Sequence, residues 1–397
     1  MRHDAKHPTT ASIARRTGPA PLIAHLIYQM GIGGLENGLI NLINQTPSGR
    51  YRHVIVCLKD QTDFCGRIKV SGIEIICLNK REGKDWSHYF RLLRVLKRLR
   101  PVLIHTRNLA CIEGQLLAAI AGVRLRVHSE HGREMADLDG SNSKHILLRK
   151  LLAPLVGHFI AVSTDLQRWL TERIGVHAQQ VTHIGNGVDS LQFHPRLGQL
   201  AALGPPGFLC DDAFVIGSVG RMVEIKDLVS LVQAFLLLLT REPERRSRLR
   251  LMLVGDGPTR KSCLELLDQA GASHLAWLPG SRHDIPQLMH AMDLFVLPSL
   301  AEGSSYTILE AMSSGLAVVA TGVGGNGDLV QSDRSGTLVP PASPARLADA
   351  IERYYYLPGL ARCHGATGRH LVLTKHSLTA MTSAYHGVYD AMLAPSL

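Results

Sequence analysis

The sequence predicts an α/β protein made of two doubly wound, Rossmann-like domains that face each other across a cleft. Three observations lead to this class. The chain has 397 residues, which is more than one hydrophobic core usually organises. Short runs rich in Val, Ile and Leu alternate with amphipathic stretches, the pattern of βαβ units around a buried parallel sheet. The pattern stops in a Gly- and Pro-rich segment near the middle of the chain and then starts again.

The first half of the sequence predicts seven strands. They fall at residues 22–29, 53–58, 74–78, 102–105, 125–129, 159–162 and 181–184. The second half predicts six more, at residues 213–219, 250–254, 274–278, 293–297, 316–320 and 336–339. Ligands of such folds bind beyond the carboxyl ends of the strands. We therefore expect the chemistry in the loops that follow the strands.

These elements divide the chain into five parts. They are a flexible basic leader (1–20), a first domain (21–192), a linker (193–212), a second domain (213–374) and a C-terminal helix (375–397) that could cross back to the first domain. The Arg15-Arg16 pair in the leader could suggest twin-arginine export. No continuous apolar region follows that pair, which favours the leader interpretation.

Composition excludes several classes of protein. Hydrophobic residues at 45% and charged residues at 19% fit a folded soluble chain, and no apolar run approaches the ~18 residues that span a bilayer. Seven scattered cysteines without a Cys-x-x-Cys pair indicate a reducing cytoplasm. The twenty histidines form no zinc motif, and most are expected in loops, so no metal is expected.

The charge is unevenly placed, with a net +11 in residues 1–190 and −1 in residues 191–397. The first half is therefore expected to meet an anionic partner, either nucleic acid, a lipid surface or a phosphate-bearing substrate. Aromatic residues make up only 5% of the chain, and no basic run interleaves with them, which argues against nucleic acid.

Residues 85–100 indicate a helix that could touch an anionic membrane. An apolar stripe (Trp86, Phe90, Leu93 and Leu96 or Val95) is flanked by basic residues (Arg91, Arg94, Lys97, Arg98 and Arg100), as in helices that lie in a membrane interface. A helix packed on a sheet also has an apolar inner face and a charged outer face. Both interpretations stay open from the sequence.

Two glycine-rich or cationic loops are suited to phosphate groups. The first strand ends in a turn from Gly31 to Gly38 that opens a helix, where backbone N–H groups can approach a phosphate, although any tight turn also favours glycine. In the second domain, Arg221 and Lys226 lie between the first strand and its helix. Two cations there suit a diphosphate; solvated surface charge is the alternative.

Glu302 and Glu310 are a second pair of candidate ligand-binding residues. The first lies in a loop after a predicted buried strand and the second in the following helix. A carboxylate accepts hydrogen bonds from vicinal hydroxyls, which a sugar and a ribose both present. The neighbours Ile308 and Leu309 make that helix largely buried, and a buried carboxylate needs a partner.

Five motifs together resemble the retaining glycosyltransferases of family 4, which have the GT-B architecture of two facing Rossmann-like domains. They are Gly33-Gly34-x-Glu36, Asn186-Gly187-Val188-Asp189, Gly220-Arg221 with Lys226, Gly255-Asp256-Gly257-Pro258, and the pair Glu302 and Glu310. Within the family, the segments His105 to Asn108, Ser129 to Arg133 and Asp137 to Asn142 are similar to exopolysaccharide sugar transferases associated with exosortase/PEP-CTERM systems.

The resemblance implies a role for each matched residue. Catalysis is assigned to His131, Arg221, Lys226 and Glu302, and donor binding to Gly33, Gly34, Arg221, Lys226, Glu302, Ile308, Leu309 and Glu310. Glu36, Asn108, Arg133 and Asp139 are expected on the acceptor side, although helix capping explains Asp139 equally well. Ser304, Tyr306 and Gly327-Asp328 depart from the family pattern.

The expected function is transfer of a hexose from a nucleoside diphosphate sugar to a saccharide or lipid-linked acceptor, in exopolysaccharide or cell-surface glycan synthesis. The resemblance implies retention of anomeric configuration, no metal and no other cofactor. The expected location is the cytoplasm, with peripheral contact at the membrane through residues 85–100. Two alternatives are a nucleotide-sugar epimerase of the same architecture and a non-catalytic basic binding protein.

Overall fold

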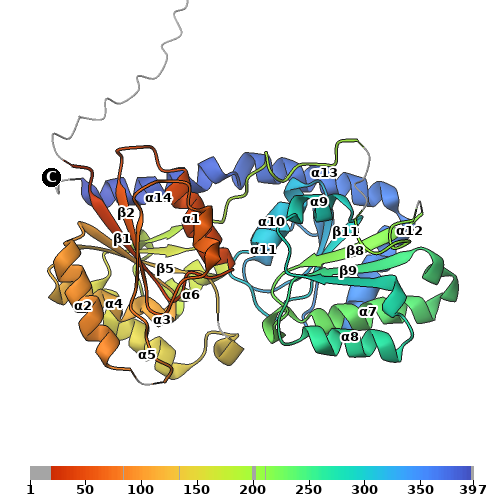
Figure 1. The fold of residues 1–397 in the computed structure, drawn as a ribbon, viewed down its shortest axis with the longest axis horizontal. Helices are drawn as coiled ribbons and strands as arrows, with labels where there is room; N and C mark the ends of the chain where they lie inside the picture. The colour runs from red at the N-terminus through yellow and green to blue at the C-terminus, as the bar shows by residue number, and fades with distance from the viewer. Residues whose placement is uncertain (1–18, 84, 134, 199–202, 211, 395–397) are drawn as a thin grey trace, which may run out of the picture.

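The structure is a computed structural model that describes residues 19–394 except residues 84, 134, 199–202 and 211. Nearly all of the expected leader, residues 1–18, lies outside the described residues. The described chain forms two α/β domains side by side, with the last two helices running along both (Figure 1). Within this described part, no helix is both long enough and apolar enough to cross a bilayer.

The first domain is built on a seven-stranded sheet in the order β3-β2-β1-β4-β5-β6-β7, with every pair parallel. The strands are β1 (Leu22–Ile27), β2 (Arg52–Cys57), β3 (Glu74–Cys77), β4 (Leu103–Arg107), β5 (Leu125–Glu130), β6 (His158–Ala161) and β7 (Val181–His183). The helices are α1 (Gly34–Asn44), α2 (Ser87–Leu99), α3 (Leu109–Ile112), α4 (Gly114–Ile120), α5 (Ser143–Leu152) and α6 (Thr164–Trp169).

The second domain has a six-stranded parallel sheet in the order β10-β9-β8-β11-β12-β13. Its strands are β8 (Phe214–Val219), β9 (Leu249–Val254), β10 (Ala276–Gly280), β11 (Leu294–Leu297), β12 (Ala317–Thr321) and β13 (Gly336–Val339). Its helices are α7 (Leu228–Arg241), α8 (Arg260–Gln269), α9 (Ile285–His290), α10 (Tyr306–Ser313), α11 (Asn326–Leu329) and α12 (Pro344–Tyr356). The α/β class with two doubly wound domains is confirmed.

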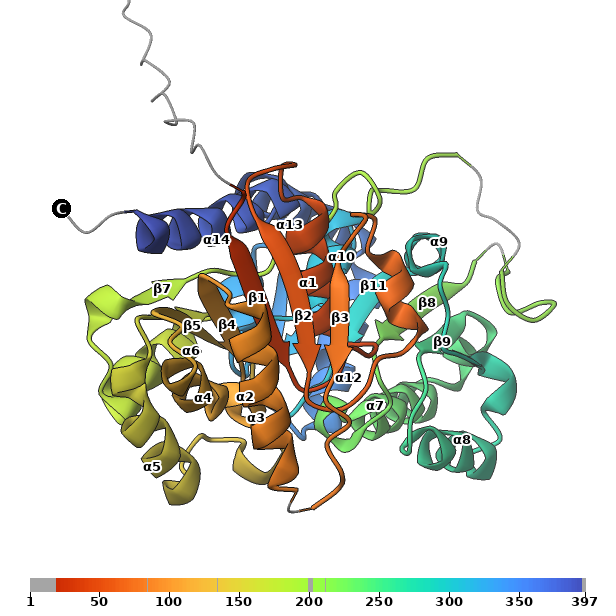
Figure 2. The same ribbon diagram turned by 60° about the vertical axis from the view of Figure 1, so that its left-hand side comes forward.

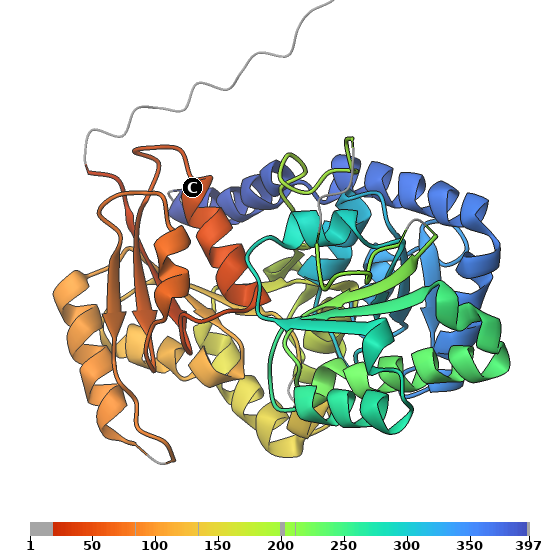
Figure 3. The ribbon, with the colours of Figure 1, turned by 45° about the vertical axis from the view of Figure 1, so that its right-hand side comes forward.

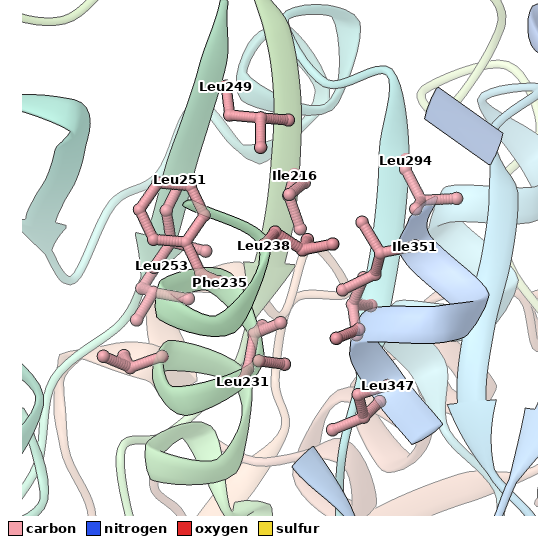
Figure 4. Close-up of a cluster of buried hydrophobic side chains, with 14 of the residues drawn as sticks. Ile216, Leu231, Phe235, Leu238, Leu249, Leu251, Leu253, Leu294, Leu347 and Ile351 are labelled. Carbon is pink, nitrogen blue, oxygen red and sulfur yellow. The ribbon is translucent and has the colours of Figure 1, made fainter. Parts of the chain in front are cut away.

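The core of the second domain explains why its strands read as continuous apolar runs. Helices α7 and α12 cover one face of the sheet, and their inner side chains interdigitate with Ile216, Leu251 and Leu294 from three strands (Figure 4). A parallel sheet covered on both faces buries side chains on both sides of each strand. β9 is accordingly buried at all six positions.

The chain crosses back to the first domain at its end. Helix α13 (Pro358–Lys375) packs on the second domain, and α14 (Leu378–Leu393) follows after Ser377, whose hydroxyl caps it by accepting from the Ala380 N–H. Tyr385 and Tyr389 of α14 are buried with Ile23 and Leu42 of the first domain. Figure 2 shows α14 passing beside β1. The first domain therefore shares its core with the end of the chain.

Two details differ from the sequence-based expectations. Buried histidines lie on strands and helices rather than in loops: His25, His105 and His128 are each 0% exposed on β1, β4 and β5. Helix α2 does not present one apolar stripe, because Leu96 packs into the core while Trp86 and Phe90 are 69% and 71% exposed. The interpretation of a helix packed on a sheet is confirmed for the face that carries Leu92 and Leu96. Contact of the exposed residues Trp86 and Phe90 with a membrane stays a prediction.

Candidate active site

The loop after β8 carries the two expected cations. Residues Glu224–Lys226 form a short 3₁₀ turn, and the Leu300 N–H donates to the Ile225 carbonyl over 2.8 Å. The Met222 N–H donates to the Asp256 carbonyl over 2.8 Å, which fixes the loop from its other side. Arg221 is exposed at the mouth of the loop and Lys226 is partly buried behind it. Both cations therefore lie in one loop at the carboxyl edge of the sheet, and contacts from the two neighbouring loops hold that loop in place.

Lys226 and Glu302 form an ion pair across this edge. The Lys226 ammonium donates to Oε1 of Glu302, and the Ser299 hydroxyl donates to the same oxygen over 2.7 Å. The two side chains are 19% and 10% exposed. A carboxylate has about four acceptor positions, so Glu302 keeps capacity for ligand hydroxyls. The pair is chemically suited to a ligand that carries both an anionic group and hydroxyls.

Glu310 lies on α10, which begins where the Ser305 hydroxyl accepts from the Ile308 N–H over 3.3 Å. Burial raises the pKa of the Glu310 carboxyl to about 8. In the described part of the chain, no side chain is seen to hydrogen-bond this carboxyl. Ile308 and Leu309 do not line the cleft: both are 0% exposed and pack in the core, because they fall on the inner face of α10.

The first domain contributes the loop before α1. Gly33 caps the helix in an extended conformation, and the Glu36 carboxylate folds back over it so closely that a Cβ at Gly33 would lie 2.2 Å from Oε2. Burial raises the pKa of Glu36, and the charges of Arg221 and Arg107 oppose that rise. Glu36 is therefore within electrostatic reach of Arg221 in the second domain and of Arg107 in the first, and its assignment to the acceptor side stays a prediction.

His131 lies at the point where the two domains touch. The backbone N–H of His131 donates to Oδ1 of Asn108 over 2.7 Å. A Cβ at Gly303 would lie only 2.0 Å from the backbone carbonyl oxygen of His131. Only glycine permits that approach of the second domain. Burial and the charge of Arg107 lower the pKa of His131 to about 3, so the ring is neutral at pH 7.

A hollow of about 370 Å³ opens beside His131 in the first domain. Asn108 and Arg133 line it, as do Glu130, Asp137, Gly140, His145, Arg149 and Trp169. Arg133 is held there by an ion pair with Asp165 at 2.8 Å. Asp139 is exposed, and its carboxylate accepts from the N–H and the hydroxyl of Ser141, which favours a local turn role.

Tyr306 bridges the domains from the first turn of α10. A Cβ at Gly38 of α1 would lie 2.3 Å from the Tyr306 oxygen, and one at Gly34 would lie 3.0 Å from its ring. A small cavity between the domains is lined by Tyr306, Arg107, His131 and α14 residues. Figure 3 shows α1 next to the second domain. Gly34 and Gly38 thus lie at the interface with the second domain.

Two further contacts join the domains. The Asp328 carboxylate accepts from the Thr164 N–H over 2.8 Å and from its hydroxyl, and the Asn186 amide donates to the Ser304 carbonyl over 2.7 Å. Asp328 and Ser304 are among the positions that depart from the family pattern. Asp328 contacts the opposite domain through its carboxylate, and Ser304 does so through its backbone carbonyl. The domains are therefore closed on each other in this structure.

Two family profiles match the chain, and together they cover about three-quarters of it. The profile described as "Glycosyltransferase Family 4" matches residues 32–190, and "Glycosyl transferases group 1" matches residues 213–356. The chain belongs to the family 4 glycosyltransferases. It is therefore a retaining enzyme of the GT-B fold, and the two matches fall on its two domains.

Relatives of this glycosyltransferase act on varied sugars. It is 25% identical to the Escherichia coli UDP-Gal:alpha-D-GlcNAc-diphosphoundecaprenol alpha-1,3-galactosyltransferase, over 80% of this chain and 83% of the relative. It is 32% identical to a Bacillus subtilis protein named putative glycosyltransferase EpsF, over 51% and 53%. Other relatives include a lipopolysaccharide core mannosyltransferase from Rhizobium leguminosarum, matched over 60% of its length.

Solved structures share the fold of the glycosyltransferase. Anabaena HepE in complex with UDP and glucose has a TM-score of 0.78 at 19% identity, covering 94% of this chain and 100% of HepE. The structure named TarM has a TM-score of 0.74 at 12% identity, covering 93% and 99%.

Sequence reasoning missed the buried side chains behind His131. Arg107 is 3% exposed, and His105, Ser129 and Glu130 are at most 1% exposed. The signal was present, since polar triplets end two strands at His105-Thr106-Arg107 and His128-Ser129-Glu130. Among the described residues, no group of three or more His, Cys, Asp or Glu side chains is arranged to hold a metal.

Proposed function

We propose that this glycosyltransferase transfers a hexose from a nucleoside diphosphate sugar to a saccharide or lipid-linked acceptor, without a metal. The observation that carries the proposal is the ion pair of Lys226 with Glu302, with Arg221 and Glu310 on the same edge of the second sheet. Fixed cations stabilise the charge that develops on a leaving diphosphate. We assign that role to Arg221 and Lys226, sugar contact to Glu302 and ribose contact to Glu310.

The relatives support a diphosphate donor and a surface-glycan role. The E. coli relative is named for UDP-galactose and a diphosphoundecaprenol-linked acceptor, and another is named for colanic acid biosynthesis. The hollow beside His131 supports a second substrate, because Asn108 and Arg133 line it outside the donor loops. We place the acceptor there, and we extend the proposal to exopolysaccharide synthesis of the exosortase/PEP-CTERM type on the motifs around His131.

A panel of nucleotide sugars tests the donor. UDP-, GDP- and ADP-sugars are added to purified protein, and the melting temperature is followed, because a bound donor stabilises the fold by mass action. One nucleotide class is expected to stabilise the wild type and not Glu310→Ala, with exposed Glu224→Gln as the control. No stabilisation by any nucleotide sugar would contradict the proposal.

Product analysis with the best donor separates the remaining alternatives. NMR of the product should show the anomeric configuration of the donor retained, and transfer should continue in excess EDTA. Formation of an epimerised sugar nucleotide without acceptor would indicate an epimerase instead. Loss of transfer with EDTA that Mn²⁺ restores would overturn metal independence.

We further propose that the first domain docks on an anionic leaflet where a lipid-linked acceptor is presented. Six large apolar side chains are exposed on or next to α2, α4 and α5, which lie together at the lower left of Figure 1: Trp86, Phe90, Leu116, Ile120, Leu147 and Leu151. Exposed cations accompany them at Arg94, Lys97, Arg124, Lys144 and Lys150. Exposed apolar and basic side chains together favour a lipid surface.

Vesicle co-sedimentation tests the docking. Wild type should sediment with vesicles that contain anionic lipid and be released at high salt. Trp86→Ser with Phe90→Ser, and separately Arg94→Glu with Lys97→Glu, should stay in the supernatant. Leu237→Ser, an exposed position on α7 of the second domain, is the control. Equal recovery of all variants in the supernatant would favour a soluble acceptor.

A further inference from the structure

A chain of buried polar side chains connects His131 to the interior of the first domain. His131 Nε2 lies 2.8 Å from the Ser129 hydroxyl, which lies 2.9 Å from Nε2 of His105. On the other side of that ring, Nδ1 lies 3.3 Å from Nη2 of Arg107. We call these four residues the His131 network. His105 and Ser129 are 0% exposed and Arg107 is 3% exposed, so water does not compete for these contacts.

Arg107 sets the direction of every hydrogen bond in the network. A guanidinium only donates, so Nδ1 of His105 must accept. The His105 ring is neutral, because burial and the charge of Arg107 hold its pKa well below the usual value. A neutral ring that accepts at Nδ1 carries its proton on Nε2. His105 therefore donates to the Ser129 oxygen.

Because Ser129 accepts from His105, it acts as the donor toward His131. A hydroxyl that accepts from His105 has its own proton to donate, and His131 Nε2 is the ring nitrogen within reach. His131 is neutral, so its proton lies on Nδ1. In the described part of the chain, Nδ1 of His131 has no hydrogen-bond partner, and the residue lines the cavity between the domains.

We propose that Arg107, His105 and Ser129 are positioning residues that fix His131 in the Nδ1–H tautomer, so that it meets the bound sugar as a hydrogen-bond donor. In this state His131 cannot take a proton at Nδ1, and its Nε2 is occupied by Ser129. It orients an oxygen of the ligand and does not act as a general base. This inference rests on the proposed function only for the identity of the ligand.

Tyr389 of α14 also favours His105 Nδ1 as an acceptor, although Arg107 alone is sufficient to make it one. Its hydroxyl lies 2.7 Å from Nδ1 of His105 and can donate to it. Nη2 of Arg107 also lies 3.2 Å from Nδ1 of His25 and can donate its second hydrogen there. Removal of the tyrosine hydroxyl leaves the guanidinium as a donor to His105. Removal of the serine hydroxyl breaks the network next to His131.

The tautomer is measured directly on the full-length protein. The protein is labelled with ¹⁵N-histidine, and long-range proton–nitrogen correlation spectra are recorded at neutral pH without ligand. The His131 signals are identified by their loss in His131→Gln. We expect Nδ1 of His131 to be the protonated nitrogen in the wild type and in Tyr389→Phe. In Ser129→Ala we expect a mixture of the two tautomers.

Kinetics with an active donor give the second readout. Ser129→Ala should lower kcat about tenfold, the lower end of the range known for metal-ligating histidines that lose their orienting partner, with KM little changed. Ser129→Thr, which keeps the hydroxyl, should restore both kcat and the tautomer. If Ser129→Thr does not fold, Tyr389→Phe serves as the comparison that retains the network.

Two results would overturn the inference. They are a wild-type His131 protonated on Nε2, and a Ser129→Ala variant whose tautomer is unchanged. Neither depends on turnover. A protein that transfers no sugar but shows the Nδ1–H tautomer would refute the proposed function and leave the positioning network standing.

Discussion

Glu310 illustrates how a single residue is held in an unfavourable state before any ligand binds. Its carboxyl is partly buried on α10, and burial raises its pKa to about 8. In the unfolded chain the same group has its ordinary pKa, near 4.5. Folding therefore keeps a proton on Glu310 at neutral pH, at a cost that a hydrogen-bonding ligand can offset.

The first prediction concerns stability against pH. Between about pH 4.5 and about pH 8 the unfolded chain releases the Glu310 proton while the folded chain retains it. The free energy of unfolding should therefore fall as pH rises through this window. Glu310→Gln removes this ionisation, so its melting temperature should match wild type near pH 5 and exceed it at pH 8. Exposed Glu265→Gln is the control; a constant difference at both pH values would contradict the prediction.

The second prediction separates the two donor-side cations. Arg221 is exposed, so Arg221→Ala should weaken UDP binding by about 1.5–3 kcal/mol, the range for a hydrogen bond to a charged group, with little change in melting temperature. Lys226→Ala also leaves the mostly buried Glu302 without its cation, so it should lower both affinity and stability. Calorimetric titration and thermal melts measure the two effects. Equal melting temperatures of both variants would argue against the ion pair.

Helices α1 and α10 fit together through a complementary pair of residues. Glycine inside a helix usually costs about 1 kcal/mol relative to alanine. Gly38 has no Cβ and so makes room for the Tyr306 hydroxyl. A Cβ added at Gly38 would lie 2.3 Å from the hydroxyl oxygen. The next ring atom, Cζ, would lie at 3.4 Å, an ordinary contact. The conflict would therefore involve the tyrosine oxygen alone.

The third prediction follows from that geometry. Gly38→Ala should lower kcat/KM because the added methyl pushes Tyr306 and α10 away from α1. The double variant Gly38→Ala with Tyr306→Phe should recover most of the loss, since only the oxygen clashes. Gly387→Ala, within α14 where a Cβ meets nothing within 4 Å, should stabilise the protein. Failure of the double variant to recover would mean that Gly38 serves another purpose.

Elements that depend on local pattern could be predicted, and contacts between distant segments could not. The strand from 102 was predicted to stop at 105, yet β4 runs to Arg107, because its polar end is buried in the His131 network. The placement of Arg221 and Lys226 in the loop after β8, and of Glu302 and Glu310 after β11 and on α10, followed from motifs; their role in donor binding stays a prediction. The fit of Tyr306 against Gly38 joins two domains and leaves no trace in local periodicity. Buried histidines were assigned to loops because polar residues are mostly exposed.

Helix α14 joins the two domains. It follows the second domain in the sequence but packs on the first domain. Helix α14 buries eight residues, among them Tyr385 and Tyr389 against the first sheet. Arg50 and Tyr51 of the first domain both bond to Asp390. The first domain is therefore incomplete without residues from the other end of the chain.

The fourth prediction tests this dependence. A chain that ends at His376 lacks α14, and the side chains of Ile23, Leu42 and Leu103 lose their cover. Each large apolar side chain uncovered costs about 1.5–3 kcal/mol. Hydrogen exchange should show β1 and β4 losing protection while β8 and β9 keep theirs. A chain that ends at Ala394 is the control, and equal protection of β1 in both chains would contradict the prediction.

Helix α14 also sets the time at which the first domain can finish folding during synthesis. Translation at roughly 5–20 residues per second needs about 10–40 s to pass from the end of β7 to the end of α14. Throughout that interval the emerging first domain exposes the apolar surface around Ile23 and Leu103 that α14 will cover. The domain that leaves the ribosome first is completed last, so the nascent chain offers a binding surface to chaperones for as long as the second domain is being made.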